Sequence, residues 1–446
     1  MIRPFLLRGG RVVDPSQGLD RKADLLVVDG RITAVESSLT GPEAAEIIDV
    51  SGLVVAPGFI DLHVHLREPG GEHKETILTG ARAAAAGGFT TVWAMPNTDP
   101  PIDDPAAVGF VRAAGERAEG ARVLPVGAAS VGRLGERMTE VGELVMAGAV
   151  AVSDDGSPIS DSGLMRRLLE YTQTFGVPLL QHAEDLRLSA DGVMNEGVVA
   201  TALGLRGIPN AAEAAMVARD IYLAELTGGH LHVCHVSTQE AVEQLRLARE
   251  RGVRVTSEVT PHHLALTEEA VRGYNTEAKV NPPLRTERDR AALRQALAEG
   301  VIDVIATDHA PHHYEEKERE FDDAPFGIDG LETAFGLVMQ EMVIPGHLTL
   351  PALIDRFSCT PARIMKLEGG TLRPGAPADI VVLDPEERWI VDPASFRSRS
   401  LNTPIAGWEL TGRVRRTIVG GRTRYVAGTA SNALPASELS ENSAAR

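Results

Sequence analysis

The sequence predicts an α/β protein, a (β/α)8 TIM-type barrel with a small β-sandwich domain built from both chain ends. Through the middle of the chain, short apolar runs alternate with alanine-rich helical stretches. Eight such apolar runs can be counted, and strand–helix alternation repeated eight times is the pattern of this barrel. At both chain ends the pattern is different: short apolar runs are separated by turn residues, as in β-hairpins, which predicts the second, smaller domain.

The chain is expected to divide into four parts. Residues 1–56 contain the runs FLLRGGRVVD and ADLLVVDGRITAVE, in which DG marks a hairpin turn, and they form the N-terminal part of the small β domain. Residues 57–363 form the barrel. Residues 364–428 return to the strand pattern in ADIVVLDPEERWIV and VRRTIVGGRTRYVAG, and they form the C-terminal part of the small domain. Residues 429–446 are small and polar, which predicts a flexible tail.

The barrel strands are expected where the apolar runs occur. They span residues 59–65, 90–95, 122–128, 149–155, 178–184, 230–236, 253–260 and 302–309. Helical candidates lie between them, for example TILTGARAAAAGG, GLMRRLLEYTQTFG and NAAEAAMVARDIYLAELTGG. In such a barrel the active site lies at the carboxyl ends of the strands.

Composition excludes several classes of protein. A formal net charge of −18 argues against nucleic-acid and anionic-membrane partners, and an anionic substrate would need local positive charge at its site. The two cysteines, Cys234 and Cys359, exclude a disulfide scaffold and indicate a reducing compartment. No signal peptide and no apolar stretch of about 20 residues can be recognised, so we expect a cytoplasmic protein.

The stretch GFIDLHVHLREPG (58–70) carries the first candidate site. In a strand, alternate side chains share a face, so Asp61, His63, His65 and Arg67 would point to one side if the strand extends that far. Two imidazoles on one face are half of a metal site, and an arginine beyond them could bind an anion. Two histidines alone could equally be an ordinary polar strand end.

Other strand ends bring further ligands to the same rim. Asp154 and Asp155 end the fourth strand, His182 the fifth, His235 the sixth and Asp308 the eighth. Each alone could belong to a solvated turn, but their joint placement favours a metal site. Four histidines and two carboxylates suit a pair of zinc ions. Alternation does not choose between Asp154 and Asp155 as the shared ligand.

A two-zinc site predicts hydrolysis. Two metals can share a hydroxide, lower the pKa of bound water and polarise a carbonyl group. A nearby carboxylate must then carry the nucleophile's proton to a leaving nitrogen, and Asp308 fits that role. Cys234 is interpreted as a core-packing residue. The remaining histidines are interpreted as structural, as orienting groups or as carrying no special role: His73, His230, His232, His262, His263, His309, His313 and His347.

Nearly the whole chain resembles the amidohydrolase superfamily, and within it the bacterial dihydroorotases that carry aspartate as bridging ligand. The motifs are GFIDLHVHLREPG, MPNT, SDDG, QHAED, HVCHVST, EVTPHH, KVNPPLR, ATDHAPH and APFG. The resemblance implies two zinc ions per subunit, bridged by Asp155 and a hydroxide, with the ligands His63, His65, Asp155, His182, His235 and Asp308. For the substrate it implies contacts from His65, Arg67, Asn97, Asn281, His312, Phe326 and Gly327, of which Arg67, Asn97 and His312 hold a carboxylate.

The resemblance implies reversible hydrolysis of (S)-dihydroorotate to N-carbamoyl-L-aspartate in de novo pyrimidine (UMP) biosynthesis. It also implies association with aspartate transcarbamoylase or a homo-oligomer. One alternative is a hydantoinase- or allantoinase-like enzyme. Such relatives usually bridge their metals with a carboxylated lysine, and no lysine occurs between Lys74 and Lys279. The other alternative is an inactive scaffold subunit of aspartate transcarbamoylase, which would be expected to lack some of the ligands.

A lid is expected over the barrel mouth. Residues 310–327, APHHYEEKEREFDDAPFG, follow directly from Asp308 and include His312. The middle of this segment is nearly all charged, so we expect it to bury little surface and to move.

Overall fold

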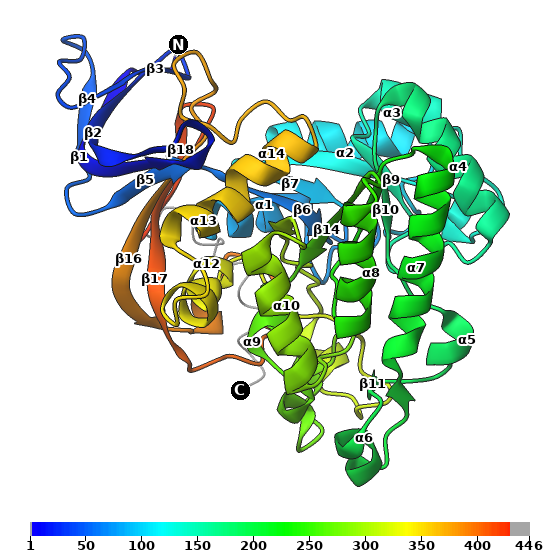
Figure 1. The fold of residues 1–446 in the computed structure, drawn as a ribbon. Helices are drawn as coiled ribbons and strands as arrows, with labels where there is room; N and C mark the ends of the chain where they lie inside the picture. The colour runs from blue at the N-terminus through cyan, green and yellow to red at the C-terminus, as the bar shows by residue number, and fades with distance from the viewer. Residues whose placement is uncertain (1, 429–446) are drawn as a thin grey trace.

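A parallel barrel of eight strands forms the middle of the protein in this computed structural model, which describes residues 2–428 (Figure 1). The strands are β6 (Phe59–Val64), β7 (Phe89–Ala94), β8 (Arg122–Ala128), β9 (Ala151–Ser153), β10 (Leu179–Gln181), β13 (Leu231–Val233), β14 (Val255–Val259) and β15 (Val304–Ile305). Neighbours along the chain pair in this order. A parallel bridge between Val64 and His309 brings the first and last strands together.

Helices cover the outside of the barrel. They are α1 (Ile77–Ala86), α2 (Pro105–Arg117), α3 (Val141–Ala147), α4 (Ser162–Phe175), α7 (Asn210–Thr227), α8 (Gln239–Glu250), α10 (Glu287–Glu299) and α12 (Ala334–Val338). Figure 1 shows α7, α8 and α10 side by side on one flank. The alanine-rich α1 packs closely: a Cβ at Gly80 would lie 2.4 Å from Leu66 Cδ2, so any larger residue would displace the Leu66 side chain at the strand end that leads into the site.

Smaller elements fill the connections and the end of the barrel. They are α5 (Leu186–Ser189), β11 (Met194–Asn195), α6 (Val198–Leu203), β12 (Gly207–Ile208), α9 (Pro261–Ala265), α11 (Tyr314–Lys317), α13 (Leu350–Ile354) and α14 (Thr360–Ile364). Within residues 2–428, no helix has the length and apolar character needed to cross a bilayer.

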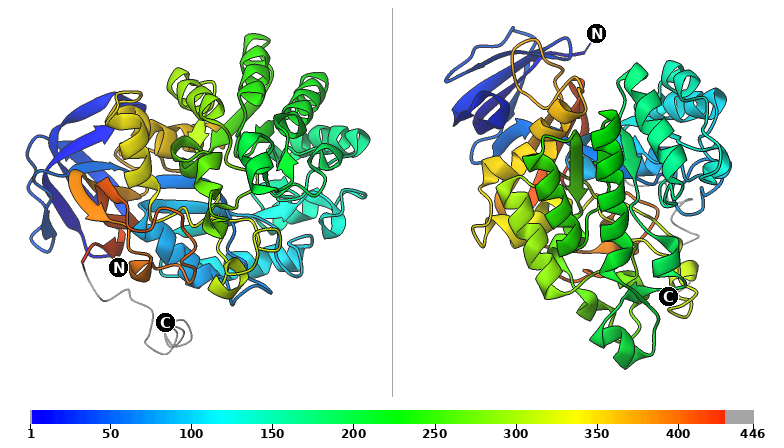
Figure 2. Two further views of the ribbon diagram at one scale, coloured as in Figure 1. Left: turned by 90° about the horizontal axis from the view of Figure 1, so that it is seen from below. Right: turned by 45° about the vertical axis from the view of Figure 1, so that its right-hand side comes forward.

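The two chain ends share one mixed sheet beside the barrel. Its strands are β1 (Phe5–Asp14), β2 (Leu19–Val28), β3 (Arg31–Glu36), β4 (Glu46–Asp49), β5 (Val54–Pro57), β16 (Ile380–Ile390), β17 (Glu409–Val419) and β18 (Arg422–Val426). The short β5 joins the two halves, because it pairs with β1 on one edge and antiparallel with β16 on the other. Figure 2 shows the blue and orange strands together from two further directions. The predicted barrel with a small β domain from both chain ends is confirmed.

The domain limits at residues 56 and 363 stay predictions, and the predicted tail, 429–446, lies outside the described residues. Six of the eight barrel strands are shorter than expected, because the chain leaves the ladder before the polar residues at the rim. The fourth strand, expected over 149–155, ends at Ser153.

The segment 310–327 is more firmly attached than its charge suggested. Lys317 is only 1% exposed, and its ammonium group donates hydrogen bonds to the carbonyl oxygens of Pro325 (3.1 Å) and Gly327 (3.0 Å). Phe321 is buried as well, and its carbonyl accepts from Lys279 Nζ at 2.6 Å. Most of the charged middle of this stretch is exposed, as expected, but Lys317 and Phe321 are buried, and carbonyl oxygens converge on the side chains of Lys317 and Lys279.

Replacing Lys317 with methionine should destabilise the fold. The aliphatic stem would still pack, but the carbonyl oxygens would lose a charged donor, at a cost of about 3 kcal/mol. Urea unfolding at pH 7 measures this as a lower midpoint. Glu315→Ala is the matched control, since its side chain is 70% exposed. A midpoint for Lys317→Met equal to that of the control would show that the segment carries no stability.

Candidate active site

A cavity of about 180 Å³ opens at the carboxyl ends of the barrel strands. Most of the side chains expected from the sequence line it, namely His65, Arg67, Asn97, Asp155, His182, His235, Asn281, Asp308, Phe326 and Gly327. Two do not: His63 is completely buried behind the wall, and His312 lies behind Arg67. A larger cavity, about 330 Å³, lies between α12 and β17, but none of its described lining residues is a histidine.

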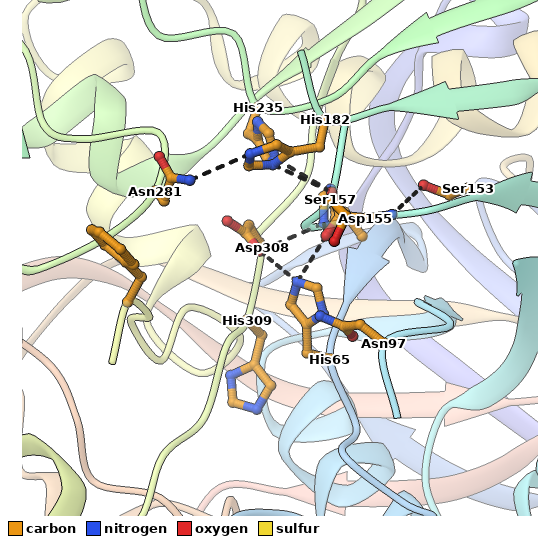
Figure 3. A network of polar contacts seen from close by, with 12 residues as sticks. His65, Asn97, Ser153, Asp155, Ser157, His182, His235, Asn281, Asp308 and His309 are labelled. Carbon is orange, nitrogen blue, oxygen red and sulfur yellow. Dashed lines mark hydrogen bonds and ion pairs between the residues drawn. The ribbon is translucent and has the colours of Figure 1, made fainter. Parts of the chain in front are cut away.

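The carboxylate of Asp155 lies between two pairs of histidines, and Figure 3 shows it between His65 on one side and His182 and His235 on the other. Its Oδ2 is 3.2 Å from His63 Nε2 and 3.5 Å from His65 Nε2. Its Oδ1 is 3.7 Å from His182 Nδ1 and 3.5 Å from His235 Nε2. One oxygen therefore faces each pair, which is the arrangement that a ligand shared by two metal ions requires.

The preceding residue, Asp154, faces away from the histidines. Its carboxylate accepts hydrogen bonds from the backbone N–H of Ser130, at 2.9 Å, and from the hydroxyl of the same serine. Arg133 donates to its backbone carbonyl. Asp154 thus holds the neighbouring loop after β8, and the geometry favours Asp155 as the bridging residue.

Asp308 lies beside Asp155 and contacts the first pair of histidines (Figure 3). Its Oδ1 is 2.9 Å from His65 Nε2 and 3.6 Å from His63 Nε2. Burial alone would raise the pKa of Asp308, but the charge of His63 and the hydrogen bond from His65 hold this pKa well below its usual range. The carboxylate is therefore ionised at neutral pH and can accept a proton or bind a cation.

Several ligand atoms in the cluster lack hydrogen bonds. His63 Nε2 and Asp155 Oδ1 are both buried without such a partner among the described residues. Buried polar atoms rarely stay unsatisfied, and imidazole nitrogens with carboxylate oxygens are the donor set that zinc prefers. The residues present therefore fit a metal centre.

The backbone bends sharply where site residues leave the strands. Arg67, His235 and Asp308 have positive φ angles of 60°, 30° and 48°, which non-glycine residues seldom adopt. The alternation expected from residue 61 to 67 ends at Val64, so Arg67 reaches the cavity through this turn and not along the strand face. Such local strain is typical of functional sites.

Positive charge lies at one wall of the cavity. Burial lowers the pKa of Arg67 to about 10, which still leaves it charged at pH 7. Its Nη2 is 3.4 Å from Nε2 of His312, and its Nε donates to the carbonyl of Pro311 at 3.1 Å. The Nε2 of His312 is also 2.8 Å from the carbonyl of Phe326, so this histidine supports the wall rather than facing the cavity.

Comparison with known proteins agrees with this geometry. The family model described as dihydro-orotase-like matches residues 52–241. A dihydroorotase from Geobacter metallireducens is 52% identical over 421 residues, covering 94% of this chain and 99% of that protein. A dihydroorotase from Anaeromyxobacter dehalogenans is 54% identical over 420 residues, covering 94% and 97%. The chain belongs to the dihydroorotase-like family.

Solved structures similar to this dihydroorotase-like chain include an L-hydantoinase (dihydropyrimidinase) from Arthrobacter aurescens. It has a TM-score of 0.85 and 27% identity, over 95% of this chain and 96% of that one. A D-hydantoinase (dihydropyrimidinase) from Thermus sp. has a TM-score of 0.82 and 26% identity, over 95% and 97%. The predicted enzyme class, a cyclic amide hydrolase with a small-molecule substrate, is confirmed, and the family implies a metal cofactor.

Three of the four histidines in the dihydroorotase-like site are also held at their far nitrogen. The contacts are His63 Nδ1 with Glu258 Oε1 at 2.6 Å, His65 Nδ1 with Asn97 Oδ1 at 2.8 Å, and His182 Nε2 with Glu184 Oε2 at 3.0 Å. Such contacts orient metal-binding imidazoles. Burial raises the pKa of Glu258, yet His63 and His232 bring it down to about 2.

Sequence reasoning missed Glu258 and Glu184. A signal was present for Glu258, since it is a carboxylate near the end of a barrel strand to which no ligand had been assigned. Glu184 lies two residues after His182, and it also accepts from Asn281 Nδ2 at 2.9 Å. That contact joins the second histidine pair to a residue expected to touch the substrate ring.

Proposed function

We propose that this protein catalyses the reversible, zinc-dependent hydrolysis of (S)-dihydroorotate to N-carbamoyl-L-aspartate, a step of pyrimidine biosynthesis. The observation that carries the proposal is the position of Asp155 between two histidine pairs, in a cavity that Arg67 and Asn97 also line. The names of its relatives support the substrate.

Two zinc ions would be held by His63 and His65 on one side and by His182 and His235 on the other, with Asp155 shared. When bound, they would supply a water nucleophile of lowered pKa and a Lewis acid for the amide carbonyl. The bound pair would also satisfy the unpaired atoms His63 Nε2 and Asp155 Oδ1.

The cavity wall would bind the substrate's carboxylate. The guanidinium of Arg67 offers a charge-assisted, bidentate contact, which gives the acidic protein its local positive charge. Asn97 accepts from His65 through Oδ1, so its amide nitrogen remains to donate to the same carboxylate. His312 would act on the carboxylate directly only after its Nε2 leaves the Phe326 carbonyl.

The ring would lie against Asn281 and the backbone of Phe326 and Gly327. These residues line the same cavity as Arg67, so they would set the distance between the carboxylate and the scissile amide. Asn281 is itself held by Glu184, which limits its rotation.

Asp308 would move the proton. As the water oxygen adds to the ring carbonyl carbon, Asp308 takes the water's proton. The C–N bond then breaks, and the same proton passes to the leaving ring nitrogen. In ring closure the steps run in reverse, so one carboxylate serves both directions.

Turnover of dihydroorotate beside hydantoin, dihydrouracil and allantoin tests the proposal. We expect dihydroorotate to have the highest kcat/KM, because it is the one of the four compounds whose carboxylate Arg67 and Asn97 could bind. A better turnover of hydantoin or allantoin would make the enzyme a different cyclic amidohydrolase. No turnover of any ring by the zinc-loaded protein would favour an inactive scaffold subunit.

Arg67→Gln should raise KM for dihydroorotate about 100-fold while zinc content stays unchanged. The expected size follows from the loss of a charged, hydrogen-bonded partner of a carboxylate, worth about 3 kcal/mol. Dihydrouracil, which lacks the carboxylate, is the matched control, and its slow turnover should not change. An equal loss with both compounds would mean that Arg67 supports the fold of the site and not the carboxylate.

We propose further that the enzyme works in the cytoplasm, as a homo-oligomer or in a complex with aspartate transcarbamoylase. Sedimentation of the pure protein, with and without that enzyme, tests the assembly. An unchanged monomer in both runs would end this part of the proposal.

A further inference from the structure

Glu258 is a completely buried carboxylate at the end of β14. Its Oε1 is 2.6 Å from His63 Nδ1 and accepts the backbone N–H of His235 at 3.2 Å. Its Oε2 is 3.0 Å from His232 Nε2. One side chain therefore touches a histidine of each pair that faces Asp155.

The first contact determines where His63 carries its proton. Its Nε2 faces Asp155, so metal binding there needs the lone pair of Nε2 and leaves the proton on Nδ1. Nδ1 must then donate to Glu258 Oε1. A neutral imidazole without this acceptor could place its proton on Nε2 and would no longer be a ligand.

The second contact gives the hydrogen-bond chain behind Glu258 a direction. His232 Nε2 donates to Glu258, so His232 Nδ1 accepts from the hydroxyl of Thr256 at 2.9 Å. That hydroxyl in turn accepts from His230 Nε2, also at 2.9 Å. Burial lowers the pKa of His230 to about 3, so it has one N–H to give. Every member of this chain is satisfied.

The third contact acts on the backbone. His235 has a φ of 30°, a conformation that a non-glycine residue keeps only when its surroundings impose it. The N–H of His235 donates to the carboxylate oxygen that also accepts from His63. The same oxygen thus helps to hold His235 where its Nε2 faces Asp155 Oδ1.

We propose that Glu258 is the positioning residue of both halves of the metal site, fixing the proton of His63 on Nδ1 and the backbone turn at His235. The proposal rests on the ligand roles proposed above for these two histidines. Glu258 is not itself a ligand, although it lies with Cys234 near His63. Its 2.6 Å contact with Nδ1 leaves no room for an ion bonded to both at about 2.0 Å in a tetrahedral site.

Comparing Glu258→Gln with Glu258→Ala tells whether Glu258 acts as a hydrogen-bond acceptor for His63 or only as a buried negative charge. Glutamine can still accept from His63 through its oxygen, while its amide nitrogen donates to His232. The chain behind it can then reverse, with His232 donating to Thr256 and Thr256 donating to His230. Alanine removes the acceptor altogether.

Zinc affinity, measured by competition with a chelator, is the main readout. We expect Glu258→Ala to bind zinc 10- to 100-fold more weakly and to lose kcat, with KM changed little at saturating zinc. Glu258→Gln should remain within a few-fold of the wild type in both. Asp220→Asn is the matched control: it changes another fully buried carboxylate, which accepts hydrogen bonds from Gln181 and Arg219, and it should leave zinc affinity unchanged.

A second pair of variants keeps the test decisive if Glu258→Ala does not fold. Thr256→Val prevents the chain from reversing, so Glu258→Gln/Thr256→Val should lose zinc affinity while Thr256→Val alone should not. Wild-type affinity in the double variant, or in a folded Glu258→Ala, would overturn the proposal. Equal zinc loss in Glu258→Gln and Glu258→Ala would overturn it too. If the wild type itself binds no zinc or leaves dihydroorotate unchanged, the proposed function fails instead.

Discussion

Asp308→Asn should lower kcat for dihydroorotate about 1,000-fold, the range that removal of a general acid–base group produces. The carboxylate lies 2.9 Å from His65 Nε2, within the cavity where the scissile amide would bind. Asparagine keeps the size and an oxygen ligand but cannot accept the proton. The loss should appear in both directions, because ring closure and ring opening would use the same group.

Steady-state kinetics together with zinc analysis decides this prediction. Zinc content should stay near that of the wild type, since four histidines and Asp155 remain. If Asp308→Asn keeps more than a tenth of wild-type kcat with its metals bound, another group carries the proton. If the zinc is lost, Asp308 acts first as a ligand, and the kinetic loss has a different cause.

Asp155→Ala should remove at least one metal ion and most of the activity. Both of its oxygens face histidine pairs, at 3.2 and 3.5 Å for the nearest contact on each side. Without that negative charge, the two cations would repel each other across the cavity. The neutral histidine pairs would then have to bind them without a shared carboxylate. Zinc analysis after dialysis measures the loss directly.

Asp154→Ala is the paired control for this prediction. Its carboxylate bonds Ser130 and not the histidines, so the variant should keep its zinc and lose some stability through the loop after β8. Loss of zinc from Asp154→Ala alone would show that the wrong aspartate has been identified as the bridge.

The sequence was sufficient to predict the barrel because its signal is local and repeated. Each apolar run is followed by a helical stretch, and eight repeats leave few other arrangements. The strand ends were less predictable. The chain turns out of the sheet just before residues such as Asp155 and Asp308, and positive φ values at His235 and Asp308 reflect constraints from the whole site, not from neighbouring residues.

The candidate ligands could be predicted for the same reason, since they follow strands that end at one rim. The choice between Asp154 and Asp155 could not, because it depends on Ser130, which is 24 residues away from Asp154. The role of Glu258 likewise depends on His63, 195 residues earlier in the chain. The burial of Lys317 depends on carbonyl oxygens of Pro325, Gly327 and, 38 residues earlier, Lys279, and no composition rule can reveal that these converge on one side chain.

The position of β5 has a consequence for synthesis on the ribosome. One edge of this strand pairs with β1 early, but the other edge waits for β16, whose first residue, Ile380, comes 323 residues after Pro57. At about 5–20 residues per second, that delay lasts roughly 16–65 s. Throughout it, the nascent chain presents an open strand edge of Val54, Val55 and Ala56, the kind of edge that invites pairing with other chains. We expect this interval to be the time when the newly made protein most needs a chaperone.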